Sequence, residues 1–250
     1  MFNLQRQKAV VTGAAQGNGE AIAKGLAQLG VTVILADMNF EKLNQVKTEI
    51  EEAGGQVYAF ALNVADQQSC LNFAQDVKST VGDIDILVNN AGILRRSNFE
   101  AETSFSDLED TINVNVKGSY YLTHAFLEAL KKTQGSVVNV ASIQSFVAAT
   151  GATAYAISKG AVAQMTKTLA AELAKYNIRV NAIAPGVIET PMTEATRANQ
   201  GALDNYMRHV PMNRMGQPVE LVGPVSFLAS SAASYVTGCI LPVDGGYLTV

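Results

Sequence analysis

The sequence predicts an α/β fold in one domain: a doubly wound parallel sheet of seven strands with helices on both faces. Short apolar runs, typical of buried strands, alternate along the chain with longer segments of helical periodicity. A glycine-rich turn joins the first of these strands to the first helix. Of the 250 residues, 48% are hydrophobic and 16% are charged, which is enough apolar surface for one large core.

The first half of the chain predicts three strand–helix units. A short buried strand leads into the glycine-rich turn, and Gly30 ends the helix that follows. Apolar side chains recur at helical spacing from Phe40 to Ile50, until the pair Gly54 and Gly55 stops the second helix. In order, the units are strand 9–12 with helix 20–29, strand 31–36 with the helix that begins at residue 40, and strand 57–61 with helix 66–81.

The second half predicts four more strands and two long helices. The first of these helices is expected to bend near Gly118, and the second carries Tyr155. Residues 189–215, rich in Met, Thr, Asn and Arg, follow the sixth strand; we interpret this long connection as a mobile substrate lid, with a fixed surface loop as the alternative. The elements are strands 86–89, 136–140, 178–184 and 239–243, and helices 106–132 and 155–176.

Tyr155 and Lys159 lie four residues apart in a predicted helix, so their side chains share one face. A cation beside a phenol lowers the phenol's pKa from its ordinary value of about 10, which makes tyrosine usable as a general acid/base near neutral pH. Ser142 lies thirteen residues upstream of Tyr155, near the end of the fifth strand. The Tyr-x-x-x-Lys spacing alone also fits an ordinary surface pair, so its meaning depends on the motifs around it.

The turn after the first strand has the composition of a dinucleotide-binding turn. Its glycines are Gly13, Gly17 and Gly19. Glycines between a strand and a helix permit a tight turn and let backbone N–H groups approach a pyrophosphate. Such a turn is informative here because both the strand and the helix flank it.

Asp37 ends the second strand, eighteen residues after Gly19. A carboxylate at this position accepts hydrogen bonds from both hydroxyls of an adenosine ribose. It also repels a 2′-phosphate, by about 4 kcal/mol for two unit charges 4 Å apart at an effective dielectric constant of 20, before screening. Gln16 and Met38 offer no positive charge to offset this repulsion. The site therefore favours NAD over NADP; a solvated strand-end carboxylate is the alternative.

Further motifs complete the pattern in a consistent order. They are the turn 12–19, Asp37, Asn63 with Val64, the run 89–92, Asn115, Ser142, Tyr155 with Lys159, and the segment 185–190. Over essentially its whole length the chain resembles the classical short-chain dehydrogenase/reductase family. The resemblance implies a Rossmann fold with strand order 3-2-1-4-5-6-7 and a nicotinamide cofactor.

The resemblance also implies a role for each matching residue. Tyr155 would exchange a proton with the substrate oxygen, which Ser142 would hydrogen-bond. Lys159 would bind the nicotinamide ribose and lower the pKa of Tyr155, and Asn115 would hold a water that links Lys159 to solvent. The implied cofactor-binding residues are Gly13, Gln16, Gly17, Asn18, Gly19, Asp37, Asn63, Val64, Asn90, Gly92, Tyr155, Lys159, Pro185, Gly186, Ile188 and Thr190. The substrate-pocket candidates beside Ser142 and Tyr155 are Gln144, Leu94, Val147, Ala148, Gly151 and Val187.

Two positions depart from the family pattern. Asn18 stands where the family often has an aliphatic residue, but its backbone N–H can still meet a phosphate. Asn63 stands where an aspartate commonly contacts adenine; its carbonyl can accept from the adenine amino group and its amide can donate to a ring nitrogen. Neither change removes the expected cofactor site.

Bulk properties narrow the class further. The net charge of −4 offers no electrostatic case for nucleic-acid binding. No run approaches the ~18 apolar residues of a membrane helix, and residues 1–8 lead into the first strand without a signal-peptide segment, so we expect a cytoplasmic protein. Cys70 and Cys239 lack any histidine cluster, which predicts free thiols and no metal. The two long helices carry surplus apolar residues, which the homotetramer of the family would bury.

These observations predict an NAD(H)-dependent oxidoreductase that acts on a secondary alcohol and its ketone, such as a polyol, a diol or a small hydroxy compound. In oxidation, Tyr155 as phenolate takes the hydroxyl proton while hydride leaves the carbinol carbon. Two alternatives remain. A 3-oxoacyl-(acyl-carrier protein) or other thioester reductase is disfavoured by Asp37 and by scattered basic groups. A non-catalytic cofactor-binding regulator would not need the set Asn115, Ser142, Tyr155 and Lys159.

Overall fold

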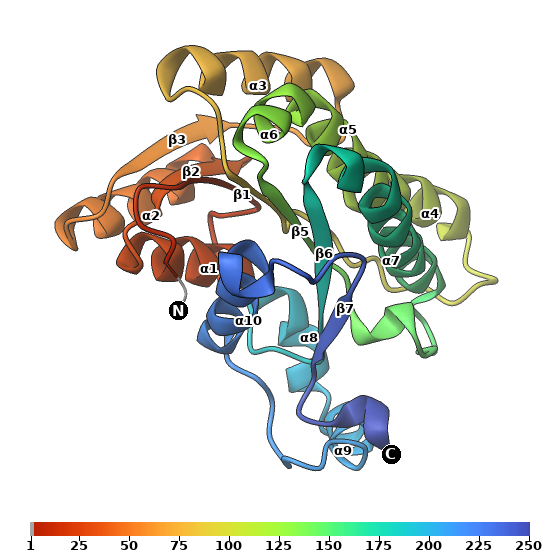
Figure 1. Ribbon diagram of the computed structural model, residues 1–250. Helices are drawn as coiled ribbons and strands as arrows, with labels where there is room; N and C mark the ends of the chain where they lie inside the picture. The colour runs from red at the N-terminus through yellow and green to blue at the C-terminus, as the bar shows by residue number, and fades with distance from the viewer. Residues whose placement is uncertain (1–2) are drawn as a thin grey trace.

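The computed structural model describes residues 3–250, so the first two positions of the predicted lead-in segment 1–8 lie outside it. Within that range the strands form one parallel sheet with the order β3-β2-β1-β4-β5-β6-β7 (Figure 1). The strands are β1 (Lys8–Thr12), β2 (Thr32–Asp37), β3 (Val57–Ala61), β4 (Ile86–Asn89), β5 (Ser136–Val140), β6 (Arg179–Pro185) and β7 (Ile240–Val243). The predicted fold class and strand order are confirmed, and no strand boundary differs from the prediction by more than one residue.

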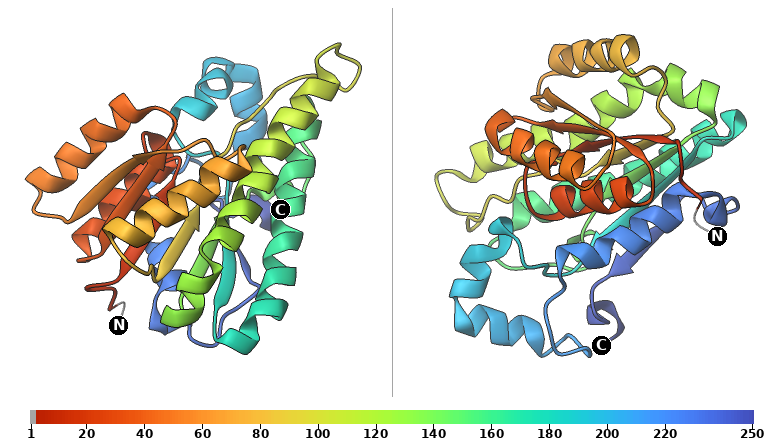
Figure 2. Two further views of the ribbon diagram at one scale, coloured as in Figure 1. Left: turned by 90° about the horizontal axis from the view of Figure 1, so that it is seen from above. Right: turned by 90° about the vertical axis from the view of Figure 1, so that its left-hand side faces the viewer.

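Both faces of the sheet are buried, and successive side chains of a strand point to opposite faces and so pack into two different cores. In β1, Ala9 and Val11 pack into one core and Val10 packs into the other. Helices cover each core, as Figure 2 shows from two sides. The first core is covered by α1 (Gly17–Gln28), α2 (Phe40–Glu52) and α10 (Val222–Ala229), and the second by α3 (Gln67–Thr80), α5 (Gly118–Ala125), α6 (Leu127–Thr133) and α7 (Thr153–Leu173).

Residues 106–132 are largely helical, as predicted, but they do not form the single helix that the sequence predicts. The structure has α4 (Ser104–Ile112), a π-helical turn (Asn113–Lys117), then α5, and α6 after a break at Phe126. The π turn ends at Gly118, where the bend was predicted. A Cβ on Gly118 would lie 2.9 Å from Val64 Cβ, so glycine is needed where this helix meets the loop after β3.

The predicted helix over residues 155–176 is confirmed except at its ends. Helix α7 begins two residues earlier, and its last turn, Ala174–Tyr176, tightens into a 3₁₀ helix. Asn177 then takes a left-handed conformation, with φ of 58°, and ends the segment before β6. The face of α7 that meets the sheet buries Ser158, Lys159 and Val162.

The connection after β6 forms a loop that is closed at its base. Ile188 pairs with Gly216 in an isolated bridge, and Glu189 N donates to Gly216 O at 2.9 Å. Two short helices, α8 (Glu194–Ala198) and α9 (Gln200–Met207), lie between these residues and beside the C-terminus (Figure 1). The segment 189–215 that the sequence singles out is therefore a structural unit beyond the carboxyl ends of β6 and β7.

Other features can be stated for residues 3–250 only. Over that range, no helix is both long enough and apolar enough to cross a membrane. The same stretch contains no cluster of three or more His, Cys, Asp or Glu side chains placed to hold a metal ion. Cys70 and Cys239 are both free thiols, and burial raises the pKa of Cys70 to about 11.

Candidate active site

A cavity of about 610 Å³ opens where the central strands end. The carboxyl edge of a doubly wound sheet, at the point where strand order reverses, is the usual ligand crevice of such folds. The predicted site residues that line it are Gly13, Gln16, Gly17, Asn18, Asp37, Val64, Asn90, Gly92, Ser142, Gln144, Tyr155, Lys159, Pro185, Gly186, Ile188 and Thr190. Leu94, Val147, Ala148 and Val187 line it as well, whereas Gly19, Asn63, Asn115 and Gly151 do not.

The glycine-rich turn is held against the end of β4. Asn90 Nδ2 donates to Thr12 O at 2.8 Å and to Gly13 O at 3.1 Å. A Cβ on Gly19 would lie 2.1 Å from Gly13 O, and Gly13 has a positive φ of 63°. Asn90 and Gly19 therefore shape the turn: the amide fixes its backbone carbonyls, and a side chain at position 19 would collide with that backbone.

Asp37 lies at the end of the cavity formed by the turns after β1 and β2, which we call the adenosine end because we predict that the adenosine of the cofactor binds there. Backbone donors hold both of its carboxylate oxygens. Ala15 N donates to Oδ2 at 3.2 Å, and Asn39 N donates to Oδ1 at 2.9 Å. The carboxylate is thus fixed beside the glycine turn. The glycines, at which a Cβ would meet the neighbouring backbone, and this fixed acceptor together fit an adenosine dinucleotide.

Asn63 has a local role in the structure. Its Oδ1 accepts from Ala65 N at 3.0 Å in the turn after β3, and its side chain is exposed outside the cavity lining. The adjacent Val64 does line the cavity. A contact from Asn63 to adenine stays a prediction.

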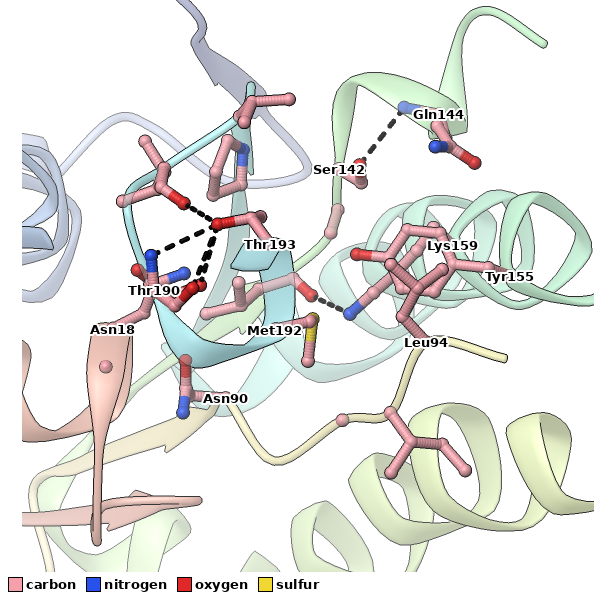
Figure 3. A pocket seen from close by; sticks show the side chains of 18 of the residues that line it. Asn18, Asn90, Leu94, Ser142, Gln144, Tyr155, Lys159, Thr190, Met192 and Thr193 are labelled. Carbon is pink, nitrogen blue, oxygen red and sulfur yellow. Dashed lines mark hydrogen bonds between the residues drawn. The ribbon is translucent and has the colours of Figure 1, made fainter. Parts of the chain in front are cut away.

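Tyr155 and Lys159 lie side by side on α7 and face the cavity, and the Ser142 side chain lies near the Tyr155 phenol (Figure 3). Lys159 Nζ donates to Val140 O at 2.7 Å and lies 5.6 Å from the centroid of the Tyr155 ring. The Ser142 hydroxyl accepts from Gln144 N at 3.2 Å, which holds it at the end of β5. Ser142 lies where β5 ends and the short 3₁₀ helix Ile143–Ser145 begins, and Tyr155 and Lys159 lie on the first turns of α7. The three side chains therefore line the same wall of the cavity.

The expected lowering of the Tyr155 pKa by Lys159 is wrong for this structure. Removal of the phenol from bulk water raises the Tyr155 pKa, while the Ser142 side chain and the charge of Arg96 act in the opposite direction. Burial also lowers the pKa of Lys159, to about 8. The spacing argument fails because it ignores desolvation, which weighs against both charged forms.

Asn115 is buried in the π turn, and its side chain is fully engaged. Oδ1 accepts from Ile93 N at 2.8 Å, while Nδ2 donates to Ile93 O at 3.0 Å and to Ser158 Oγ at 2.9 Å. Gly92 lies between this amide and the lysine, because a Cβ there would be 3.1 Å from Asn115 Oδ1 and 3.6 Å from Lys159 Nζ. Both hydrogens of the Asn115 amide are thus donated within the protein, and Oδ1 and the backbone carbonyl each accept one hydrogen bond, the latter from Ser119 Oγ at 3.1 Å. A water held by Asn115 stays a prediction.

The sequence analysis left Arg96 out of the site. Arg96 lines the cavity from the loop after β4, and its Nη2 donates to Thr196 Oγ1 on α8 at 2.7 Å. Its charge reaches the Tyr155 phenol, whose pKa it lowers. In the sequence, two adjacent arginines, Arg95 and Arg96, follow the predicted cofactor-binding run 89–92 and could have indicated a cation at the site. Only Arg96 lines the cavity, because Arg95 pairs with Asp110 on α4.

The segment 189–215, the predicted lid, forms one wall of the cavity and is held in place by hydrogen bonds; its mobility stays a prediction. Thr193 Oγ1 donates to Ile188 O at 2.6 Å and accepts from Thr190 N at 3.1 Å (Figure 3). The Tyr206 hydroxyl on α9 accepts from Val187 N at 2.8 Å, and the Tyr206 ring stacks on Tyr247 with centroids 4.8 Å apart. The lid is therefore attached both to the end of β6 and to the C-terminal segment.

Comparisons with known proteins agree with the fold and the cavity. The family described as enoyl-(acyl carrier protein) reductase matches residues 13–248. A 3-oxoacyl-(acyl-carrier-protein) reductase from Thermotoga maritima is 41% identical over 246 residues, covering 98% of this chain and 99% of the relative. A gluconate 5-dehydrogenase from Gluconobacter oxydans is 37% identical over 247 residues, covering 98% and 96%.

A solved structure is similar over the whole chain. It is a gluconate 5-dehydrogenase from Burkholderia cenocepacia in complex with NADP and tartrate, with a TM-score of 0.96, 34% identity, and coverage of 100% of this chain and 98% of that one. The chain belongs to the classical short-chain dehydrogenase/reductase family. It is accordingly an oxidoreductase that acts on an alcohol or ketone with a nicotinamide cofactor.

Proposed function

We propose that this chain is an NAD(H)-dependent oxidoreductase for a small polyhydroxy acid and the corresponding keto acid. The observation that carries the proposal is the position of Arg96, a cation that lines the cavity and acts on the Tyr155 phenol. A guanidinium suits a carboxylate because it can donate two parallel hydrogen bonds. Relatives named as gluconate dehydrogenases, and the tartrate in one of their structures, support the same substrate class.

A second polar group in the cavity supports a hydroxylated substrate. Gln144 Oε1 is buried and has no hydrogen-bond partner among residues 3–250. An unpaired buried acceptor costs about 1–3 kcal/mol, and a substrate hydroxyl would satisfy it. Leu94, Val147 and Val187 provide the apolar remainder of this end of the cavity.

The chemistry assigned to the site needs one proton carrier and one positioning group. A bound nicotinamide dinucleotide supplies the hydride acceptor or donor. Ser142 donates to the substrate oxygen and holds it beside Tyr155, whose phenolate takes the hydroxyl proton during oxidation. The phenol returns that proton to the carbonyl oxygen in reduction. The Ser142 side chain and the charge of Arg96 favour the phenolate, and Lys159, cationic below its pKa of about 8, would hold the nicotinamide ribose beside it.

NAD is the cofactor that we propose from Asp37. Its carboxylate is oriented by Ala15 N and Asn39 N, which leaves it in position to accept from ribose hydroxyls. Some solved relatives contain NADP, so kcat/KM with each cofactor is the measurement that tests this assignment.

The substrate proposal is tested with a matched pair: an aldonate such as gluconate and sorbitol, its uncharged alditol counterpart, each assayed by NADH formation. We expect kcat/KM for the acid to exceed that for the alditol by at least ~10-fold, since a charge-assisted hydrogen bond contributes about 1.5–3 kcal/mol. Arg96→Gln should remove this advantage, and Arg95→Gln, which alters a neighbouring arginine paired with Asp110, should retain it. Equal kcat/KM values for acid and alditol in the wild type would refute the assignment.

A second candidate is reduction of carrier-bound 3-oxoacyl thioesters, which the relative from Thermotoga maritima supports. A docking site for an acidic carrier protein should be basic near the cavity mouth. Arg96 lines the cavity, but the adjacent Arg95 is paired with Asp110. The other basic groups, Lys131 and Lys132 before β5 and Lys175 before β6, lie at the amino edge of the sheet and away from the cavity. We therefore expect weak, salt-insensitive thioester reduction. The second candidate replaces the first if carrier-bound substrates react at least ~10-fold better than every free alcohol, with a steep loss in salt.

We also propose a cytosolic homotetramer. Phe105 on α4 is 88% exposed, Tyr120 on α5 is 52% exposed and Ile157 on α7 is 49% exposed, so these helices present apolar side chains that the monomer leaves uncovered. Two-fold packing of such faces would bury them. Light scattering at micromolar concentration should give about four times the chain mass of 26.5 kDa, and a monomer would contradict the proposal.

A further inference from the structure

Four side chains connect the two turns that form the adenosine end of the cavity. Asp37 Oδ1 accepts from Asn39 N at 2.9 Å, and Asn39 Oδ1 caps α2 by accepting from Lys42 N at 3.1 Å. The Lys42 ammonium then reaches back and donates to Gln16 Oε1 at 2.9 Å. Because Gln16, Asp37 and Met38 all line the cavity, this connection holds a lysine at its rim.

Lys42 differs from the other lysines on α1 and α2. Lys24 pairs with Glu20 and Glu49, and Lys47 pairs with Glu51 at 3.5 Å. Over residues 3–250 the Lys42 ammonium has no carboxylate within 4.0 Å; its recorded side-chain partner is the neutral amide of Gln16. It is therefore an exposed cation with unneutralised charge, a few residues from the carboxylate that selects the ribose.

Gln16 and Met38, the neighbours of Asp37 in the predicted site, carry no positive charge, but Lys42 does. Its proximity to the site is not evident from the sequence, because it lies five residues after Asp37. The cap formed by Asn39 fixes the first turn of α2, and the lysine then extends back along that turn to Gln16. A phosphate offers an ammonium a stronger, charge-assisted partner than an amide oxygen does.

We propose that Lys42 is a specificity-determining residue whose ammonium leaves Gln16 to bind the 2′-phosphate of NADP, which makes NADP an accepted second cofactor despite Asp37. The inference rests on the proposed cofactor site. Asp37 still disfavours the phosphate through its charge, so NAD remains the better cofactor. Lys42 reduces the preference for NAD over NADP. Its contact with the phosphate would be exposed to solvent, so salt should weaken it.

The test uses adenosine fragments, so that it does not depend on turnover. Adenosine 2′,5′-bisphosphate and 5′-AMP are titrated calorimetrically against the full-length wild type, Lys42→Gln and the control Lys47→Gln. Lys42→Gln should lose roughly three- to tenfold in affinity for the bisphosphate, with less than about twofold change for 5′-AMP. It should also lose part of the salt dependence of bisphosphate binding. Lys47→Gln, which alters a lysine one turn further along α2, should match the wild type for both ligands.

The outcomes separate this inference from the cofactor proposal. Unchanged bisphosphate affinity in Lys42→Gln, with 5′-AMP still binding, overturns the role of Lys42 alone. Failure of both fragments to bind the wild type overturns both the role of Lys42 and the proposed adenosine site. A parallel measurement of kcat/KM should show a loss with NADP and no change with NAD in the same variant.

Discussion

The two ends of the cavity are built in different ways. The adenosine end consists of two short turns that follow adjacent strands, β1 and β2, and backbone groups and glycines determine its shape. The substrate end combines side chains from four distant segments: Arg96 after β4, Gln144 after β5, Tyr155 on α7 and Tyr206 on the lid. Local chain geometry thus determines one end, and tertiary packing determines the other. Changes at the two ends should therefore have separable effects.

The sharpest separation is expected for Tyr155→Phe. We expect kcat to fall by roughly 10²–10⁴, the usual contribution of a positioned acid/base, because the variant has no phenol to carry the proton. NADH affinity, measured by fluorescence titration, should remain near the wild-type value because the ring still packs and Lys159 is unchanged. Activity above a tenth of the wild type would remove Tyr155 from its assigned role.

The reciprocal change lies at the adenosine end. The wild type should use NAD with a kcat/KM at least ~30-fold above that for NADP, on the order of 2 kcal/mol after screening of the Asp37 charge. Replacing Asp37 by Ser together with Met38 by Arg should shrink or invert this ratio, while the preference between substrates stays the same. If the unmodified protein uses both cofactors equally well, Asp37 does not select the cofactor.

Lys159 lies between the two ends, and its pKa gives a pH test. The folded-state pKa of about 8 lies below the ordinary value of 10.5, so between these values the unfolded chain holds a proton that the folded chain has lost. Stability therefore rises with pH in this window. Relative to Lys159→Met, the wild type should gain about 2 kcal/mol in free energy of unfolding between pH 7.5 and 10, measured by urea denaturation. Parallel curves for the two proteins would show that Lys159 is not desolvated.

The smallest effect is expected at the lid. Tyr206→Phe keeps the stack on Tyr247 but leaves Val187 N without its acceptor, which costs about 1 kcal/mol. Since this bond attaches α9 to the end of β6, we expect substrate KM to rise roughly fivefold with cofactor affinity unchanged. Tyr58→Phe, a change on β3 far from the lid in the fold, serves as the control. An equal loss of cofactor affinity in Tyr206→Phe would show that the two ends are coupled.

The contrast between an end of the cavity that local chain geometry determines and one that tertiary packing determines also explains what could be predicted from the sequence. Every strand was placed within one residue, and the residues of the glycine turn and Asp37 do line one end of the cavity or shape it, because those features are encoded in short contiguous segments. The π turn was missed because its composition is ordinary, and it is evident only where Gly118 meets Val64. Arg96 and Tyr206 were missed because their partners lie 100 and 19 residues away.

The π-helical turn Asn113–Lys117 lies between α4 and α5. Such a turn accommodates one residue more than an α-helical turn, so deleting one residue from it would restore a regular α-helical turn between α4 and α5. The cost of that deletion would fall on the turn itself, because Asn115 would lose the position from which it bonds Ile93 and Ser158. The extra residue thus serves to place this amide, and the length of the chain is less constrained here than the identity of Asn115.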